Sequence, residues 1–348
     1  MSGRLLDVSW WAGAEVGEIM PLVYGARAME LFSVHCAWWV MPQTPRSRRL
    51  RTVSRINDVD PQEPAAFLEA APGEDRVTVM LAAFEGWNDA GEAASDALKY
   101  LHRLWGAKRV GVIEPDEYYD FQFTRPEVRL TSTGGHKIKW PVTKIAKASI
   151  PDSAIDVILV HGIEPSYRWR AYTAELLAKA AELNVNYVVL VGALLADVPH
   201  SRPMPVTATC DDEELASRLK LEASQYEGPI GIVGVINEVA LLAGLPTISL
   251  WAAVPHYVAQ APSPKAELAL LNRIEDFLKI SLPTAKVADD AHAWERGVNE
   301  LAAGDPEIAA YVQQLEEAKD TAELPEATGE SIAQEFERYL RKRGNEQP

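Results

Sequence analysis

The chain has 348 residues, of which 47% are hydrophobic and 24% are charged, and this composition is typical of a globular protein with a substantial buried core. It excludes wholesale disorder, a collagen-like fibre and a protein with many membrane spans. The formal net charge of −16 at pH 7 repels a phosphate backbone, so nucleic acid is not an expected partner. The two cysteines, Cys36 and Cys210, support neither a disulfide framework nor a zinc site, which favours a reducing cytoplasm.

Residues 1–75 are predicted to form a poorly ordered N-terminal extension, of which residues 1 to about 57 are expected to be dispensable for folding. Its segment 20–41 is apolar, but Arg27 and Glu30 interrupt the run, so we do not expect it to span a membrane. The arginine-rich segment 45–55 follows and leaves a second interpretation open, in which the extension is an arm that binds a partner or a membrane surface.

Residues 76–262 are predicted to form an α/β domain, because short runs rich in Val and Ile alternate with longer amphipathic stretches. We expect a mixed, largely parallel sheet flanked by helices. The segment 127–141 predicts a β-hairpin that turns at Gly134 and Gly135. Strands are expected at 76–83, 108–114, 155–162, 187–194, 206–210 and 247–255, and helices at 88–105, capped by Asn88 or Asp89, at 169–183, and from 211 for a short distance.

Residues 263–348 are predicted to form a C-terminal helical region, because the strand pattern stops and prolines divide the remaining amphipathic segments. Isolated helices of this length are marginal in water, so their apolar stripes should be covered by the same domain or by another copy of the chain. The first stripe is Leu268, Leu271, Ile274, Glu275 and Leu278, and the last is Ile332, Phe336, Tyr339 and Leu340.

Motifs that bind phosphate or carry a nucleophile are missing from the sequence. It contains neither the P-loop pattern G-x-x-x-x-G-K-[ST] nor the nucleophile elbow G-x-S-x-G. Gly228, Gly231 and Gly234 do not have the spacing of a dinucleotide-binding loop and predict close backbone packing. His161 and Glu164 are expected to form a structural hydrogen-bonded couple. We expect no metal and no cofactor.

Three loops follow strands of the predicted parallel sheet, at the edge where open α/β sheets bind ligands. They span residues 84–91, 161–170 and 196–203 and combine carboxylates, arginines and aromatic side chains. If they converge, they form a cleft or binding surface. The candidate residues are Glu85, Trp87, Asn88, Asp89, Glu164, Arg168, Trp169, Asp197, His200 and Arg202.

The same residues allow two interpretations. In an active site, Arg168 and Arg202 would together grip a carboxylate or phosphate. In a purely structural arrangement, Asp89 caps its helix, Arg168 pairs with a nearby carboxylate, and the other residues form a rim. No catalytic residue is assigned.

Five ordered segments resemble the PAC2 (proteasome assembly chaperone 2) family in its actinobacterial branch. They are FEGWNDAG, HGIEPSYRWR, VGALLADVPHSRP, YEGPIGIVGVIN and WAAVPHYVAQAPSPK, and the resemblance spans about residues 76–282. It implies a fold like that of purine nucleoside phosphorylases, with a helical C-terminal region. Family members with assigned roles help to assemble or cap the 20S proteasome.

The resemblance therefore predicts a cytoplasmic, protein-binding or proteasome-assembly-chaperone-like homo-oligomer, a trimer rather than a dimer, with proteasome subunits as partners. Relatives dock through a C-terminal hydrophobic-Tyr-X tail, whereas this chain ends Arg-Gly-Asn-Glu-Gln-Pro, so binding should survive removal of Gly344 to Pro348. The alternative is a small-molecule enzyme that uses the cleft at the carboxyl ends of the strands. It would be a nucleoside or phosphate-ester hydrolase or phosphorylase, or a carboxylate-amine ligase.

Overall fold

The computed structural model describes residue 68 and residues 75–323, all of them within the compact unit Asp60–Pro348. Apart from residues 68 and 75, the predicted extension over 1–75 lies outside the described residues. So does the predicted stripe of Ile332, Phe336, Tyr339 and Leu340.

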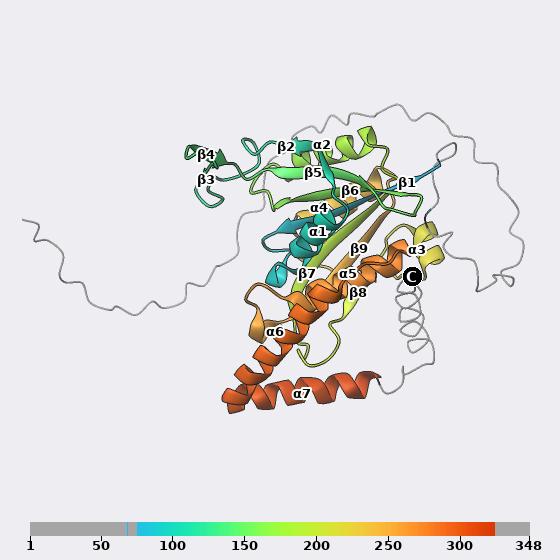
Figure 1. The fold of residues 1–348 in the computed structure, drawn as a ribbon. Helices are drawn as coiled ribbons and strands as arrows, with labels where there is room; N and C mark the ends of the chain where they lie inside the picture. Colours follow the sequence, from blue (N-terminus) through green and yellow to red (C-terminus); the bar gives the residue numbers. More distant parts are fainter. Residues whose placement is uncertain (1–67, 69–74, 324–348) are drawn as a thin grey trace, which may run out of the picture. The chain divides into compact units, whose positions relative to one another are not determined.

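A seven-stranded mixed sheet forms the centre of the described structure (Figure 1). Four neighbouring strands, β6, β1, β7 and β9, pair in parallel, while β2 with β5, β5 with β6, and β9 with β8 pair antiparallel. The mixed α/β fold predicted from the sequence is confirmed. The strands in spatial order are β2 (Lys108–Ile113), β5 (Thr143–Ser149), β6 (Ile155–Ile163), β1 (Val77–Glu85), β7 (Tyr187–Ala196), β9 (Thr247–Pro255) and β8 (Val206–Thr209).

Helices bury both faces of this sheet. One face packs against α1 and α5, and the opposite face packs against α2 and α4. This explains why β1 and β7 are apolar on both sides, as central parallel strands are. The helices are α1 (Ala93–Leu104), α2 (Trp169–Glu182), α3 (Glu213–Leu219), α4 (Ile232–Leu242), α5 (Pro264–Leu278), α6 (Ala285–Gly304) and α7 (Pro306–Glu323), with 3-10 turns at Ala90–Glu92 and His256–Val258.

The predicted hairpin is present as β3 (Glu127–Leu130) and β4 (His136–Lys139), which pair only with each other and form a separate two-stranded sheet. Figure 1 shows the hairpin projecting beyond β2 and β5.

The predicted helix at 88–105 was wrong at its start. Gly91 and Glu92 have φ angles of 60° and 54°, so the chain makes a 3-10 turn before α1 begins at Ala93.

The free energy of unfolding should depend on pH through Glu267, a partly buried carboxyl group on α5. Burial, with Asp96 and Asp290 nearby, raises its pKa from 4.5 to about 7, while Arg103 and Lys99 oppose the shift. Because the folded state holds the proton more tightly than the unfolded state, this stabilisation is present at low pH and is lost as the pH rises from about 4.5 to 7.

Replacing Glu267 with glutamine should therefore stabilise the protein at pH 8 and change little at pH 4. The full shift corresponds to about 3 kcal/mol, which partial exposure reduces to about 2 kcal/mol. Thermal unfolding at both pH values checks this, with Glu182→Gln on the exposed side of α2 as control. Equal stabilisation at pH 4 and pH 8 would contradict it.

Candidate functional site

A buried pair joins the first two candidate loops. Asn88 is 1% exposed, and its Nδ2 donates to Glu164 Oε1 at 2.7 Å. The same oxygen accepts from the backbone N–H of Ile232, the first residue of α4, at 2.8 Å. A carboxylate is favoured at a helix N-terminus, where backbone N–H groups lack partners within the helix. Glu164 thus ties α4 to both loops.

The side chain of Asn88 packs closely against Gly231. The backbone carbonyl oxygen of Asn88 accepts from the backbone N–H of Ala193 on β7 at 2.8 Å. A Cβ atom added to Gly231 would lie 2.1 Å from Asn88 Oδ1, so only glycine fits at this position. The predicted close packing around Gly231 is confirmed. We call Asn88, Glu164, Gly231 and Ile232 the Asn88 knot.

Glu85 and Asp89 support the same region without joining the Asn88–Glu164 hydrogen bond. Glu85 Oε1 lies 3.1 Å from His161 Nε2 and 3.2 Å from Lys99 Nζ, and these contacts lower its pKa from 4.5 to about 2. Asp89 accepts from the backbone N–H of Ala94 at 2.7 Å, as the structural interpretation predicted, and burial raises its pKa. His161 therefore pairs with Glu85 rather than with Glu164.

Arg168 and Trp169 lie at the start of α2 and have local partners. The exposed guanidinium of Arg168 forms a salt bridge with Glu117, and Arg168 has a φ of 55°. The indole of Trp169 donates to the carbonyl of Pro165. Arg168 thus has the carboxylate partner that the structural interpretation expected.

The third candidate loop contacts the helical region. His200 is 1% exposed, and its Nδ1 and Nε2 lie 2.8 Å from Tyr257 Oη and 3.1 Å from Asn299 Oδ1. Burial lowers the pKa of His200.

Arg202 makes two hydrogen bonds to Asp320 on α7, at 2.8 and 2.7 Å. The side chain of Asp197 is 77% exposed. Its Oδ1 accepts a hydrogen bond from the hydroxyl of Tyr311 on α7 at 3.1 Å.

Strand register explains why the third loop is separate. Ala193 on β7 is level with the first loop, because it forms a β-bridge with Asp89 and its N–H donates to the backbone carbonyl of Asn88. β7 continues to Ala196, beyond its predicted end. Asp197 comes four residues after Ala193, about 13 Å further along an extended strand. The structure thus brings the first two loops together and connects the third to α6 and α7.

Exposed apolar side chains lie next in sequence to residues of the Asn88 knot and to its partner Ala193. Trp87 and Ile230 directly precede Asn88 and Gly231, and Leu194 directly follows Ala193. Tyr226 Oη donates to the carbonyl of Pro229 at 2.9 Å, which fixes its ring beside this turn. Among these residues sequence reasoning identified only Trp87. We call the set the carboxyl-edge patch; it comprises Trp87 (64% exposed), Leu194 (44%), Leu195 (50%), Tyr226 (62%) and Ile230 (44%).

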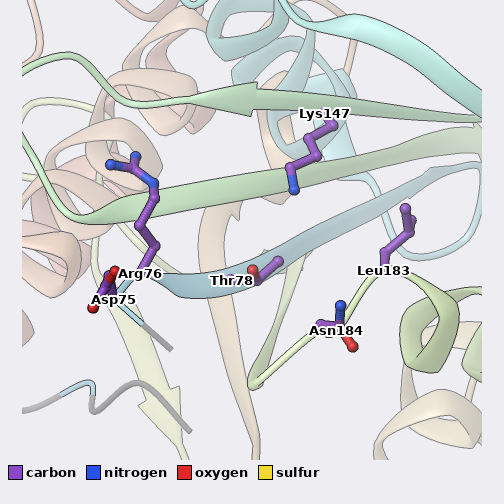
Figure 2. A pocket seen from close by; sticks show the side chains of 6 residues that line it. All are labelled: Asp75, Arg76, Thr78, Lys147, Leu183 and Asn184. Carbon is purple, nitrogen blue, oxygen red and sulfur yellow. The ribbon is translucent and has the colours of Figure 1, made fainter. Parts of the chain in front are cut away.

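A shallow pocket lies at the opposite, amino edge of the sheet (Figure 2). Arg76 and Lys147 border it, and both form salt bridges with Asp156, at 2.8 and 3.1 Å. Its lining residues are Asp75, Arg76, Thr78, Lys147, Leu183 and Asn184.

In the part of the chain that the structure describes, no three His, Cys, Asp or Glu side chains are placed to hold a metal ion. No helix within 75–323 has the length and apolar character needed to cross a membrane.

Replacing Arg202 with alanine should loosen α7. It removes the paired hydrogen bonds to Asp320 and a 3.6 Å contact with Glu316. Proteolysis within 306–323 should become faster, because cleavage follows the population of the opened segment. Arg168→Ala, whose partner is Glu117, is the matched control. An unchanged cleavage rate for Arg202→Ala would show that these contacts do not hold α7.

Comparisons with known proteins agree with this architecture. The family model described as PAC2 family matches residues 83–302. The crystal structure of a PAC2 family protein from Streptomyces avermitilis is 51% identical, covers 68% of this chain and 99% of its own, and has a TM-score of 0.64. A proteasome-assembly chaperone homologue from Mycobacterium tuberculosis is 46% identical, covers 67% and 99%, and has a TM-score of 0.62.

A more distant structure shares the fold. PbaB from Pyrococcus furiosus, an archaeal proteasome activator, is 16% identical, covers 67% of this chain and 96% of its own, and has a TM-score of 0.52. The search of curated proteins gave no match. The family match over most of the described residues, together with close relatives from Streptomyces and Mycobacterium, shows that the chain belongs to the PAC2 family, in its actinobacterial branch.

Proposed function

We propose that this PAC2 protein binds another protein through the carboxyl-edge patch, in the manner of a proteasome-assembly chaperone. The observation that carries the proposal is the patch itself. Exposed Trp and Tyr side chains are the residue types that dominate binding energy at protein interfaces. The buried Asn88 knot holds the loops that carry them, so little conformational entropy is lost on binding.

The hydrogen bonds and salt bridges of the charged candidate residues favour protein binding over catalysis on a small molecule. Glu164 is bound to Asn88 and α4, while Arg168 and Arg202 are paired with Glu117 and Asp320. A catalytic cleft needs such groups to converge on a substrate, whereas here each has a separate structural partner. The carboxyl-edge patch, in contrast, consists of exposed apolar and aromatic side chains.

The relatives indicate the class of partner. The Mycobacterium tuberculosis relative is named a proteasome-assembly chaperone homologue. We therefore propose α subunits of the 20S proteasome, in the cytoplasm, as the partner of this chain. Metal and cofactor have no part in this proposal.

Binding of the purified full chain to purified α subunits tests the proposal. Biolayer interferometry should give saturable binding with a dissociation constant in the micromolar range or below, and an unrelated acidic protein serves as control. Absence of binding at about 50 μM α subunit, with both proteins folded, would overturn the choice of partner.

A further inference from the structure

The β3–β4 hairpin has two chemically different faces. Side chains directly opposite each other on paired strands lie on one face, and successive residues of a strand alternate between the faces. Val128 is opposite Ile138, and Leu130 is two residues after Val128, so these three apolar side chains share one face. Val128, Ile138 and Leu130 are 66%, 51% and 75% exposed.

The other face of the hairpin carries charged side chains. Arg129 is opposite Lys137, and Glu127 is opposite Lys139. Glu127 forms a salt bridge with Arg129 on its own strand and lies 3.7 Å from Lys139 Nζ. On this face β3 therefore has one charge of each sign, whereas β4 has two lysines. A strand added beside β4 would meet positive charge.

The outer edge of β4 is free to pair with another strand. The hairpin is a sheet of two strands, and neither strand pairs with any other strand within residues 75–323. All eight strand residues are exposed, and the hairpin projects away from the central sheet (Figure 1). The outer edge of such a strand carries backbone N–H and C=O groups that can pair with an extended segment of another chain.

Hydrogen bonding at the turn shows which backbone groups point outward. The N–H of Thr131 donates to the carbonyl of Gly135 at 2.8 Å, so these two residues form a hydrogen-bonded pair. Hydrogen-bonded and non-hydrogen-bonded pairs alternate along an antiparallel ladder. His136 and Ile138 therefore belong to non-hydrogen-bonded pairs, and their N–H and C=O groups point away from β3.

We propose that the outer edge of β4 binds an extended peptide segment of another protein, antiparallel to β4, in which apolar and acidic residues alternate. The apolar residues of the segment lie opposite His136 and Ile138 and exchange backbone hydrogen bonds with them. The acidic residues lie opposite Lys137 and Lys139. A second β4 strand is disfavoured at this edge, because it would place lysines opposite lysines. This inference is independent of the carboxyl-edge patch and its proposed partner, because its test uses neither.

Fluorescence anisotropy with the purified full chain and the fluorescein-labelled peptide Val-Glu-Val-Glu-Val-Glu-Val-amide tests the proposal. Binding should be saturable, and a peptide with Lys in place of every Glu should bind about tenfold more weakly, because its charges repel the lysines of β4. Non-specific attraction to a chain with a net charge of −16 would instead favour the lysine peptide.

Charge reversal on β4 should reverse the preference between the two peptides. Lys137→Glu with Lys139→Glu should bind the lysine peptide more tightly than the glutamate peptide. Lys286→Glu with Arg296→Glu, two exposed positions on α6, changes the net charge by the same amount and should keep the wild-type preference. Circular dichroism should show an unchanged fold for both variants.

N-methylation of the peptide separates strand addition from charge attraction alone. Methyl groups on the backbone nitrogens of the valines remove the N–H groups that face β4 and should abolish binding. Methyl groups on those of the glutamates, whose N–H groups face away, should leave binding intact. No saturable binding at about 1 mM peptide, equal loss from both methylated peptides, or an unchanged preference after Lys137→Glu with Lys139→Glu would each overturn the proposal.

Discussion

Replacing Gly231 with alanine should destabilise the protein by about 3 kcal/mol, the upper end of the usual cost of overpacking a well-packed site. The added Cβ would lie 2.1 Å from Asn88 Oδ1, and Asn88 cannot move away without breaking its 2.7 Å hydrogen bond to Glu164. Gly231 has a φ of −88°, so the cost arises from steric contact and not from backbone strain. Thermal unfolding should show a decrease of about 6–12 °C in the melting temperature.

Gly111→Ala provides the control for this experiment. A Cβ atom at Gly111 would meet its nearest neighbours at 3.8 Å, an ordinary contact distance. Its melting temperature should stay the same or rise slightly, because alanine is favoured over glycine within a strand. If Gly231→Ala were as stable as Gly111→Ala, the Asn88 knot would not be the rigid element described above.

Replacing Trp87 with alanine should weaken binding to proteasome α subunits by about 30-fold, the effect of removing an aromatic hot spot worth about 2 kcal/mol. Trp87 is 64% exposed, so the melting temperature should change by only a few degrees at most. Ile230→Ala, at the residue that precedes Gly231, should weaken binding about fivefold, because less apolar surface is removed.

Leu242→Ala is the matched control for the patch. Leu242 is 86% exposed and is the last residue of α4, whereas the patch lies beside the first. Its affinity should equal that of the wild type. If all three variants bound equally well, the carboxyl-edge patch would not be the contact surface.

Sequence reasoning identified most strands because buried strands have a distinctive composition. The bounds of β9, Thr247–Pro255, were predicted correctly from its apolar run. β5 was missed, because its sequence TKIAKAS places lysines on the exposed side of an edge-proximal strand. α4 was not assigned, because its largely apolar sequence, interrupted only by Asn237 and Glu238, does not distinguish a buried helix from a buried strand.

The candidate site was harder to predict because its partners are far apart in the sequence. Local rules placed Asp89 near the start of α1 and indicated close packing at Gly231, and both features are present. His200 has one partner 57 residues away, Tyr257, and another 99 residues away on α6, and the partner of Arg202 on α7 is 118 residues away. Where β7 ends depends on its pairing with β9, which composition alone does not determine.

The most direct test of the central claim is hydrogen exchange of the full chain with and without proteasome α subunits. We predict protection on binding in three separate segments that carry the carboxyl-edge patch, residues 86–90, 193–197 and 226–232, with the amino-edge segment 183–186 unchanged. Protection confined to the amino edge, or binding without protection in the three patch segments, would contradict the account.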